Sequence, residues 1–142
     1  MKKILLLIIG ISFFSISSIA QSQAEVIYQD DKIKVEMSKQ DCNYNNNAIS
    51  HTYGIIKYTN LTNNEIELNF ELELWYNNVK QINTQNDVSD EPAEKNLHLD
   101  PNEIIEGSCS TRESFLRVLE KHNHPKMDIK LTDINFVINK IK

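Results

Sequence analysis

Residues 65–76 alternate between polar and apolar side chains, and this alternation restricts the fold more than any other feature of the sequence. The apolar members are Ile66, Leu68, Phe70, Leu72, Leu74 and Tyr76. The intervening residues are glutamate or asparagine, and only Trp75 departs from the pattern. A period of two places alternate side chains on opposite faces of a strand, whereas a helix would distribute them around its circumference. The segment therefore predicts a long strand, or two strands bent at a bulge, with one buried face in an antiparallel sheet.

Shorter segments repeat the β pattern elsewhere in the chain. They cover residues 26–28, 33–37, 52–60, 97–99, 104–109, 127–131 and 134–138. The polar run Asn60–Asn64 lies between residues 52–60 and 65–76, which predicts that these two strands form a hairpin. Seven or so short strands favour an all-β fold, an antiparallel two-sheet sandwich that is immunoglobulin-like in the broad sense. A small antiparallel barrel is the alternative.

One segment differs from its neighbours. Ser110 and Glu113 have the spacing of a capping box, apolar residues cluster over 115–119, and Pro125 follows as a stop signal. This combination predicts a short helix near 111–121. A strand over 115–119 is the alternative, because the same residues can extend a sheet.

Asparagine is unusually common in this chain, while only Gly54 and Gly107 lie beyond the first twenty residues. Asparagine tolerates the left-handed backbone conformation better than most residues with a side chain. We therefore expect asparagine to occupy turn positions that glycine usually takes.

The first twenty residues have the three-part layout of a secretory signal peptide. Lys2 and Lys3 precede an apolar run over residues 4–14, and small and polar residues follow up to Ala20. The run is shorter than the roughly 20 residues needed to span a bilayer. Cleavage after Ala20 or Ala24 fits the small-residue rule, and we favour Ala20.

Export and net charge limit the partners of the mature chain. Cleavage after Ala20 would leave one domain over 21–142 in the periplasm or outside the cell, with no further apolar run to span a membrane. The formal net charge is −5 for the whole chain and −7 without residues 1–20, because that segment carries Lys2 and Lys3 and no acid. This charge argues against binding to nucleic acid or to an anionic membrane surface.

The chain contains two cysteines, Cys42 and Cys109. An even number of cysteines in an exported protein favours a disulfide. Neither cysteine lies in a motif that would lower its pKa for nucleophilic catalysis. We therefore predict a Cys42–Cys109 disulfide, with two buried free thiols as the alternative.

Several strand-and-turn motifs resemble those of a group of bacterial proteins. They are Tyr58–Ile66, Glu73–Asn77, Leu99–Glu103 and Glu106–Cys109. In these motifs the chain resembles small uncharacterised exported proteins of Bacteroidota-type bacteria. The resemblance implies a β-sandwich and a location in the cell envelope, and it carries over no catalytic residue.

The acidic side chains of the alternating strand are the first candidate site. They are Glu65, Glu67, Glu71 and Glu73, which share one strand face. Carboxylate oxygens are the ligands that calcium prefers, so Glu71 and Glu73 are candidate metal ligands if a neighbouring strand or loop completes the site. The alternatives are a docking surface for a basic partner and a solvated face neutralised by cross-strand lysines such as Lys34 or Lys57.

His122 and His124 form a His-x-His pair, the second candidate metal site. In an extended segment both imidazoles point the same way, which suits zinc or copper. No third ligand can be identified, although His98, Asp128 and Glu120 are open options. An exposed loop is the alternative.

A long polar stretch over residues 77–94 joins two predicted strands. Loops of this length usually have a function or are mobile. Trp75 and Tyr76 at its root, together with Tyr44, form a candidate contact surface for a partner. A flexible loop, or an edge strand over 79–82, is the alternative.

Short motifs of common enzyme families are missing from the chain. It contains no G-x-S-x-G, H-E-x-x-H, P-loop or G-x-G-x-x-G sequence. We therefore predict no catalytic residue and no cofactor, and we expect an exported binding module whose partner is a protein or a glycan. A divalent-metal-binding protein is the first alternative, and a small hydrolase is the second.

Overall fold

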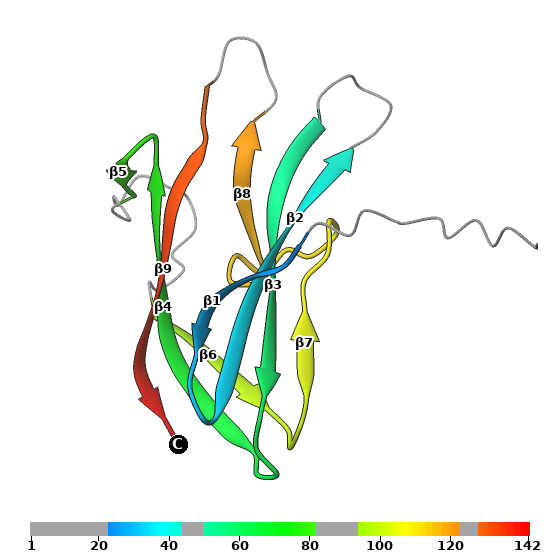
Figure 1. Ribbon diagram of the computed structural model, residues 1–142, viewed down its shortest axis with the longest axis vertical. Coiled ribbons are helices and arrows are strands. Elements are labelled where there is room, and N and C mark those ends of the chain that lie inside the picture. The colour runs from blue at the N-terminus through cyan, green and yellow to red at the C-terminus, as the bar shows by residue number, and fades with distance from the viewer. Residues whose placement is uncertain (1–22, 44–49, 82–93, 123–127) are drawn as a thin grey trace, which may run out of the picture.

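Two antiparallel β-sheets pack together in the computed structural model (Figure 1). The structure describes residues 23–43, 50–81, 94–122 and 128–142, and within them it contains strands and turns but no helix. The strands are β1 (Glu25–Gln29), β2 (Ile33–Asn43), β3 (Ser50–Asn60), β4 (Ile66–Tyr76), β5 (Val79–Lys80), β6 (Glu94–Leu99), β7 (Ile104–Glu106), β8 (Arg117–His122) and β9 (Leu131–Ile141). The predicted all-β antiparallel sandwich is confirmed.

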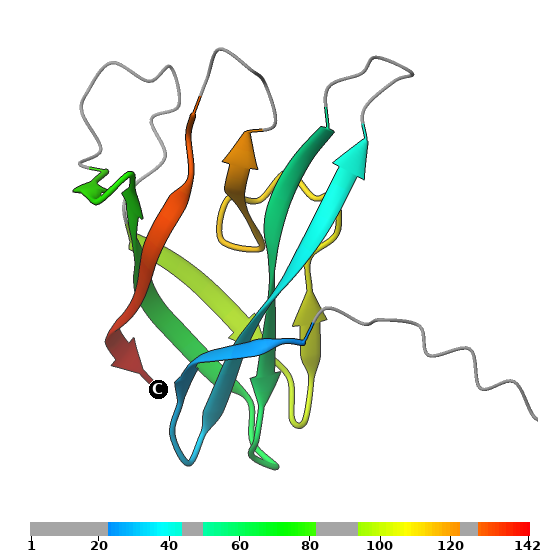
Figure 2. The same ribbon diagram turned by 45° about the horizontal axis from the view of Figure 1, so that its top comes forward.

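The first sheet is built around β2 and β3, which pair antiparallel along eleven residues each. β1 pairs with the other edge of β2. The second edge of β3 is shared by two short strands, because β8 pairs with residues 51–55 and β7 with residues 57–59. In Figure 2, β8 (orange) lies beside the upper part of β3 and β7 (yellow) beside its lower part.

β4 is the central strand of the second sheet. β9 pairs with one side of it from Leu68 to Tyr76, and β6 pairs with the other side from Ile66 to Glu71. β5 continues that second side at Trp75 and Tyr76. Ile66, Leu68 and Phe70 are buried while the residues between them are not, so the alternation predicts the buried face correctly.

The buried faces of the two sheets meet in one apolar core. Its central contacts are aromatic: the ring of Phe70 lies 4.8 Å from that of Phe136 on β9 and 5.5 Å from that of Tyr58 on β3. Tyr58 and Phe70 are fully buried, and burial of a side chain of this size stabilises the fold by about 1.5–3 kcal/mol. These rings therefore hold the first sheet against the second. Other core residues are Ile33, Val35, Met37, Ile56, Ile66, Leu68, Leu97, Leu99, Leu116, Val118 and Leu131.

The predicted hairpin of residues 52–60 with residues 65–76 is wrong. β3 and β4 belong to different sheets, so residues 61–65 carry the chain from one sheet to the other. Both edges of β3 are already paired, one with β2 and the other with β7 and β8. β4 therefore takes its partners from the second sheet.

Asn60 fixes this crossing between the sheets. Its side chain is buried at the end of β3, and its Nδ2 donates hydrogen bonds to the carbonyls of Asn64 and Asp100 at 2.7 and 2.8 Å. Its Oδ1 accepts from the backbone N–H of Thr62 at 2.9 Å. One buried amide thus satisfies polar groups of two turns, and it ties the turn before β4 to the turn after β6.

The short helix predicted near 111–121 is also wrong, and the alternative strand forms instead. β8 begins at Arg117 and pairs with the open edge of β3. Glu113 accepts a hydrogen bond from the adjacent backbone N–H of Arg112, which is not a capping-box contact. Burial follows a period of two, at Leu116, Val118 and Glu120. Tertiary pairing with β3 therefore outweighs the local helix signals.

Asparagine supplies the left-handed turn positions, as predicted. Among the described residues, the positive φ angles belong to Asn77 (50°), Asn78 (66°) and Asn102 (58°), and none belongs to glycine. Asn77 and Asn78 form the two-residue turn between β4 and β5, where a type I′ turn needs positive φ at both positions. Asn102 follows Pro101 in the turn between β6 and β7.

A disulfide joins Cys42 near the end of β2 to Cys109 in the segment between β7 and β8. The two Cα atoms lie 5.5 Å apart, as the predicted pairing requires. The bond is compatible with an oxidising compartment. A search of the described residues for a helix long and apolar enough to cross a bilayer finds none.

Some predictions fall on residues outside the described ranges. They concern the signal peptide over 1–20 with its cleavage after Ala20, and the side chains of Tyr44 and His124. Of the polar stretch over 77–94, the structure describes residues 77–81 and 94.

Candidate functional site

A groove lies across the outer face of the second sheet. It has a volume of about 630 Å³ and is lined from β4, β6 and the end of β9. Leu68 and Leu97 on its floor are buried towards the core, so the residues next to them in β4 and β6 point outwards. Its other lining residues are Glu67, Asn69, Asn96, His98, Asn139, Lys140 and Lys142.

Strand register arranges the polar side chains of the groove in two rows across the sheet. Asn96 of β6 lies opposite Asn69 of β4, which in turn lies opposite Lys140 of β9. In the neighbouring row His98 lies opposite Glu67. Lys142 continues that second row, because Glu67 and Lys142 exchange two backbone hydrogen bonds of 3.2 and 3.0 Å.

The groove combines hydrogen-bond donors and acceptors with charges of both signs. The Nδ2 of Asn69 donates to the Oδ1 of Asn96 at 2.9 Å, and the Nζ of Lys142 lies 3.8 Å from a carboxylate oxygen of Glu67. Hydrogen bonds among the described residues leave the Oδ1 of Asn69, the Nδ2 of Asn96 and the Nζ of Lys140 available to a ligand.

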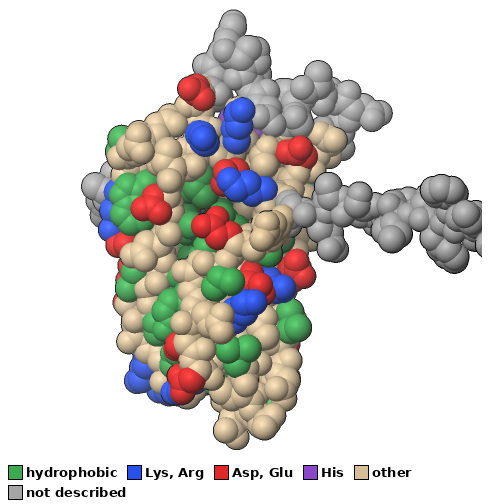
Figure 3. All heavy atoms as spheres, in the orientation of Figure 1, with side chains coloured by type: hydrophobic (Ala, Val, Ile, Leu, Met, Phe, Trp, Pro, Cys, Tyr) green, Lys and Arg blue, Asp and Glu red, His purple; other side chains and the backbone are tan. Residues whose placement is uncertain are grey.

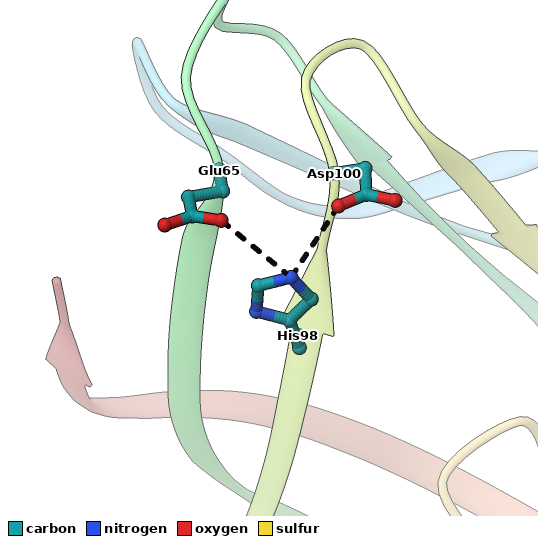
Figure 4. A group of neighbouring side chains, drawn as sticks. All are labelled: Glu65, His98 and Asp100. Atoms are coloured by element: carbon teal, nitrogen blue, oxygen red, sulfur yellow. Dashed lines mark ion pairs between the residues drawn. The ribbon is translucent and has the colours of Figure 1, made fainter.

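His98 also belongs to a cluster at the end of the groove (Figure 4). Its Nε2 lies 3.4 Å from Oδ1 of Asp100 and 4.0 Å from Oε2 of Glu65. The three ligand atoms lie within 4.8 Å of one another, and all three residues are exposed. The Asn60 amide ties together the two turns beside this cluster, since it contacts the carbonyls of Asn64 and Asp100. An imidazole with two carboxylates is a donor set that zinc accepts.

The predicted acidic stripe is present on the outer face, but Glu71 and Glu73 do not converge on a common point with a third ligand. Asn139 donates to Glu71 at 3.4 Å, and Glu73 binds Lys80 and the amide of Asn135. These hydrogen bonds, from Lys80 first, hold the pKa of Glu73 below its usual value. Within the described residues, the group of three potential ligands contains neither glutamate.

Lys34 and Lys57 do not neutralise this stripe, which corrects the cross-strand pairing that we expected. They belong to the first sheet, where their ammonium groups lie 2.7 and 2.8 Å from the carboxylate of Glu36. On the face shown in Figure 3, acidic and basic side chains are interspersed.

Trp75 and Tyr76 point to opposite faces of the second sheet, so they do not form one contact surface. Trp75 shares the outer face with the glutamates, and the Nζ of Lys80 lies 5.4 Å from the centre of its ring. Tyr76 packs against the core instead. Burial raises the pKa of Tyr76 to about 12, and the nearby Glu120 carboxylate contributes to this shift.

His122 has a neighbour that the His-x-His pattern does not indicate. It lies opposite His51 of β3, and the two ring centres are 4.5 Å apart. Only the register of β8 against β3 brings the two histidines together. The sequence predicts a helix in place of β8, so it does not indicate this pair. Groove residues such as Asn69 and Asn96 escape sequence reasoning because they too come together only through strand register.

Comparisons of the chain with protein-family models, with curated proteins and with solved structures give no match.

Proposed function

We propose that this protein is an exported, non-catalytic binding module that holds a neutral oligosaccharide in the groove on its second sheet. The observation that carries the proposal is the double row of amide, imidazole, carboxylate and ammonium groups across β6, β4 and β9. The signal sequence and the Cys42–Cys109 disulfide support export to the periplasm or the cell exterior.

A saccharide fits this array because each hydroxyl group both donates and accepts a hydrogen bond. Asn69 offers an acceptor and Asn96 offers a donor at adjacent positions, which matches two neighbouring hydroxyls. Lys140 and Lys142 outnumber the one carboxylate of the lining, Glu67, but Glu65 and Asp100 add two carboxylates beside His98 at the end of the groove. Charges of the two signs therefore nearly balance, which favours a ligand without net charge.

The size and lining of the groove agree with binding rather than catalysis. A volume of about 630 Å³ lies within the range of small-molecule sites, roughly 300–1,000 Å³. Among the described residues that line it, Glu67 is the one carboxylate, whereas cleavage of a glycosidic bond usually uses a pair of carboxylates. A polypeptide strand is a poorer fit, because β-strand addition uses the backbone of a sheet edge and not side chains across its face.

A glycan array probed with the purified, untagged chain tests the proposal, followed by calorimetric titration of the best oligosaccharide. We expect Asn69→Ala and Asn96→Ala each to weaken binding by about tenfold, the cost of one hydrogen bond to a buried ligand group. Asn135→Ala is the matched control, because Asn135 lies on the outer face of β9 but outside the groove. Absence of any glycan binding, or equal loss in all three variants, would contradict the proposal.

Divalent-metal binding is a second candidate function, favoured by the Glu65–His98–Asp100 cluster. The three ligand atoms need only small side-chain rotations to approach a zinc ion, because all three residues are exposed. Titration with zinc should then show a binding event at this cluster that His98→Ala removes. Zinc binding that is unchanged in His98→Ala would exclude this cluster as the site.

A further inference from the structure

Two histidines lie side by side in the first sheet, where β3 begins and β8 ends, and Figure 1 shows these two strand ends together near its top. His51 of β3 and His122 of β8 are cross-strand partners. Their ring centres are 4.5 Å apart and their planes are inclined by 82°. Both residues are partly buried, and the Nδ1 atom of each ring is shielded from solvent.

This spacing suits two imidazoles that bind the same metal ion. Ligand nitrogens lie about 2.0–2.1 Å from zinc, so two imidazoles in adjacent positions around one ion have ring centres about 4.5–5.2 Å apart, with the larger value at the tetrahedral angle. The observed separation of 4.5 Å falls at the lower end of that interval. The paired strands therefore hold the two imidazoles close enough together to share one ion.

The backbone holds both histidines in place before any metal binds. His51 lies between Cys42 of β2 and His122 of β8, and the Cys42–Cys109 disulfide anchors the β2 end of this row. On its other side His122 donates a backbone hydrogen bond of 3.1 Å to the carbonyl of Ile129. Two ligands fixed on paired strands lose little conformational entropy when they bind an ion.

We propose that His51 and His122 form a binding site for a divalent transition metal, with copper(II) preferred over zinc. Imidazole nitrogen is a good ligand for both ions, and sites of this type generally bind copper(II) more tightly than zinc. Water molecules complete the coordination. Calcium and magnesium do not bind, because they take oxygen ligands. The site is independent of the proposed groove, since the two share no residue.

Calorimetric titration of the untagged chain with copper(II), zinc and calcium chlorides tests the proposal. We expect saturable binding of one copper(II) ion at this site, weaker binding of zinc and no heat from calcium. His51→Ala and His122→Ala should each weaken copper binding by at least about tenfold, since loss of even an outer-shell partner costs 10–100-fold. Lys121→Ala is the matched control, because Lys121 is the exposed neighbour of His122 on β8 and carries no imidazole.

A second measurement keeps the test valid if a variant fails to fold, which circular dichroism would reveal. Copper(II) added below one equivalent to the unaltered chain should broaden the NMR signals of the His51 and His122 rings before those of His98. Copper binding that survives in both His51→Ala and His122→Ala would overturn the proposal. So would loss of binding in Lys121→Ala, or selective broadening of the His98 ring. Glycan binding by the groove is measured separately, so failure of one proposal leaves the other intact.

Discussion

The hydroxyl of Tyr58 donates a hydrogen bond of 2.8 Å to the backbone carbonyl of Phe115. Tyr58 lies in the middle of the core on β3, while Phe115 lies in the segment that leads into β8. Burial of this phenol raises its pKa strongly. The bond therefore links the aromatic core to the segment for which the sequence predicts a helix, and it satisfies a polar group that could not otherwise be buried.

Tyr58→Phe should lower the free energy of unfolding by about 1–3 kcal/mol, because it leaves the Phe115 carbonyl without its partner while the ring remains in the core. Urea unfolding followed by tryptophan fluorescence measures the change. Tyr28→Phe is the matched control, since its hydroxyl binds the side chain of Asp30 in a less buried setting. An equal loss of unfolding free energy in the two variants would show that burial does not determine the cost of removing the hydroxyl.

Replacing each of the two described glycines with alanine should lower the stability of the fold by different amounts. A Cβ at Gly54 would lie 2.5 Å from Sδ of Met37 and 3.0 Å from Val118, whereas a Cβ at Gly107 would overlap the backbone carbonyl of Leu116. A methionine side chain can move more easily than a paired backbone. We expect Gly54→Ala to cost about 1–3 kcal/mol in urea unfolding, the usual range for overpacking, and Gly107→Ala to cost more.

The Gly54 prediction has an internal control. In a Met37→Ala background the space around residue 54 is larger, so Gly54→Ala should cost less there than in the unaltered chain. The same background should leave the cost of Gly107→Ala unchanged, because Leu116 and not Met37 limits that site. If Met37→Ala lowered the cost of Gly54→Ala and of Gly107→Ala by the same amount, the steric explanation would be wrong.

Local patterns predict the strands of this fold better than their partners. The alternation that places Leu68 and Phe70 in the core needs no knowledge of the rest of the chain. Strand pairing, in contrast, depends on residues that are far apart in the sequence. The short polar turn after β3 predicts a hairpin, but the chain crosses to the other sheet there, and Asn60 binds the carbonyl of the distant Asp100. Residues 117–122 carry both helix and strand signals, and the open edge of β3 decides between them.

The candidate sites depend even more on pairing. His98 meets Glu65 through the register of β6 with β4, and His51 meets His122 through the register of β3 with β8. Sequence spacing selects His122 but pairs it with His124, because only near neighbours can be compared. Period and spacing report which face a residue occupies, whereas a site requires residues from several strands on one face.

Removal of the disulfide should destabilise the fold. Cys42 and Cys109 are 67 residues apart, and the chain-entropy model assigns a loop of this length about 4 kcal/mol of stabilisation. We expect the Cys42→Ala/Cys109→Ala double variant to lose up to about this amount in urea unfolding. Reduction of the unaltered chain with dithiothreitol should give a similar loss. Unchanged stability in both measurements would show that the bond does not constrain the unfolded chain.

Stability should fall at acidic pH, and Glu36 should account for part of the fall. Hydrogen bonds from Lys34 and then Lys57 hold the pKa of Glu36 below its usual value. A lowered pKa means that the folded chain holds the ionised carboxylate more favourably than the unfolded chain does. The stabilisation is therefore complete above the unfolded value, about 4.3, and is lost as the pH falls through the folded value.

Glu36→Gln tests this assignment through the shape of the pH profile. The variant should be less stable than the unaltered chain by about 1 kcal/mol at pH 7, and the difference should shrink as the pH falls below about 4. Glu94→Gln is the control, because Glu94 is exposed on the edge strand β6. Because Glu36 side-chain exposure is only 13%, salt should weaken the effect less than it weakens an exposed pair. A constant difference between pH 7 and pH 3 would show that packing, and not the charge of Glu36, is responsible.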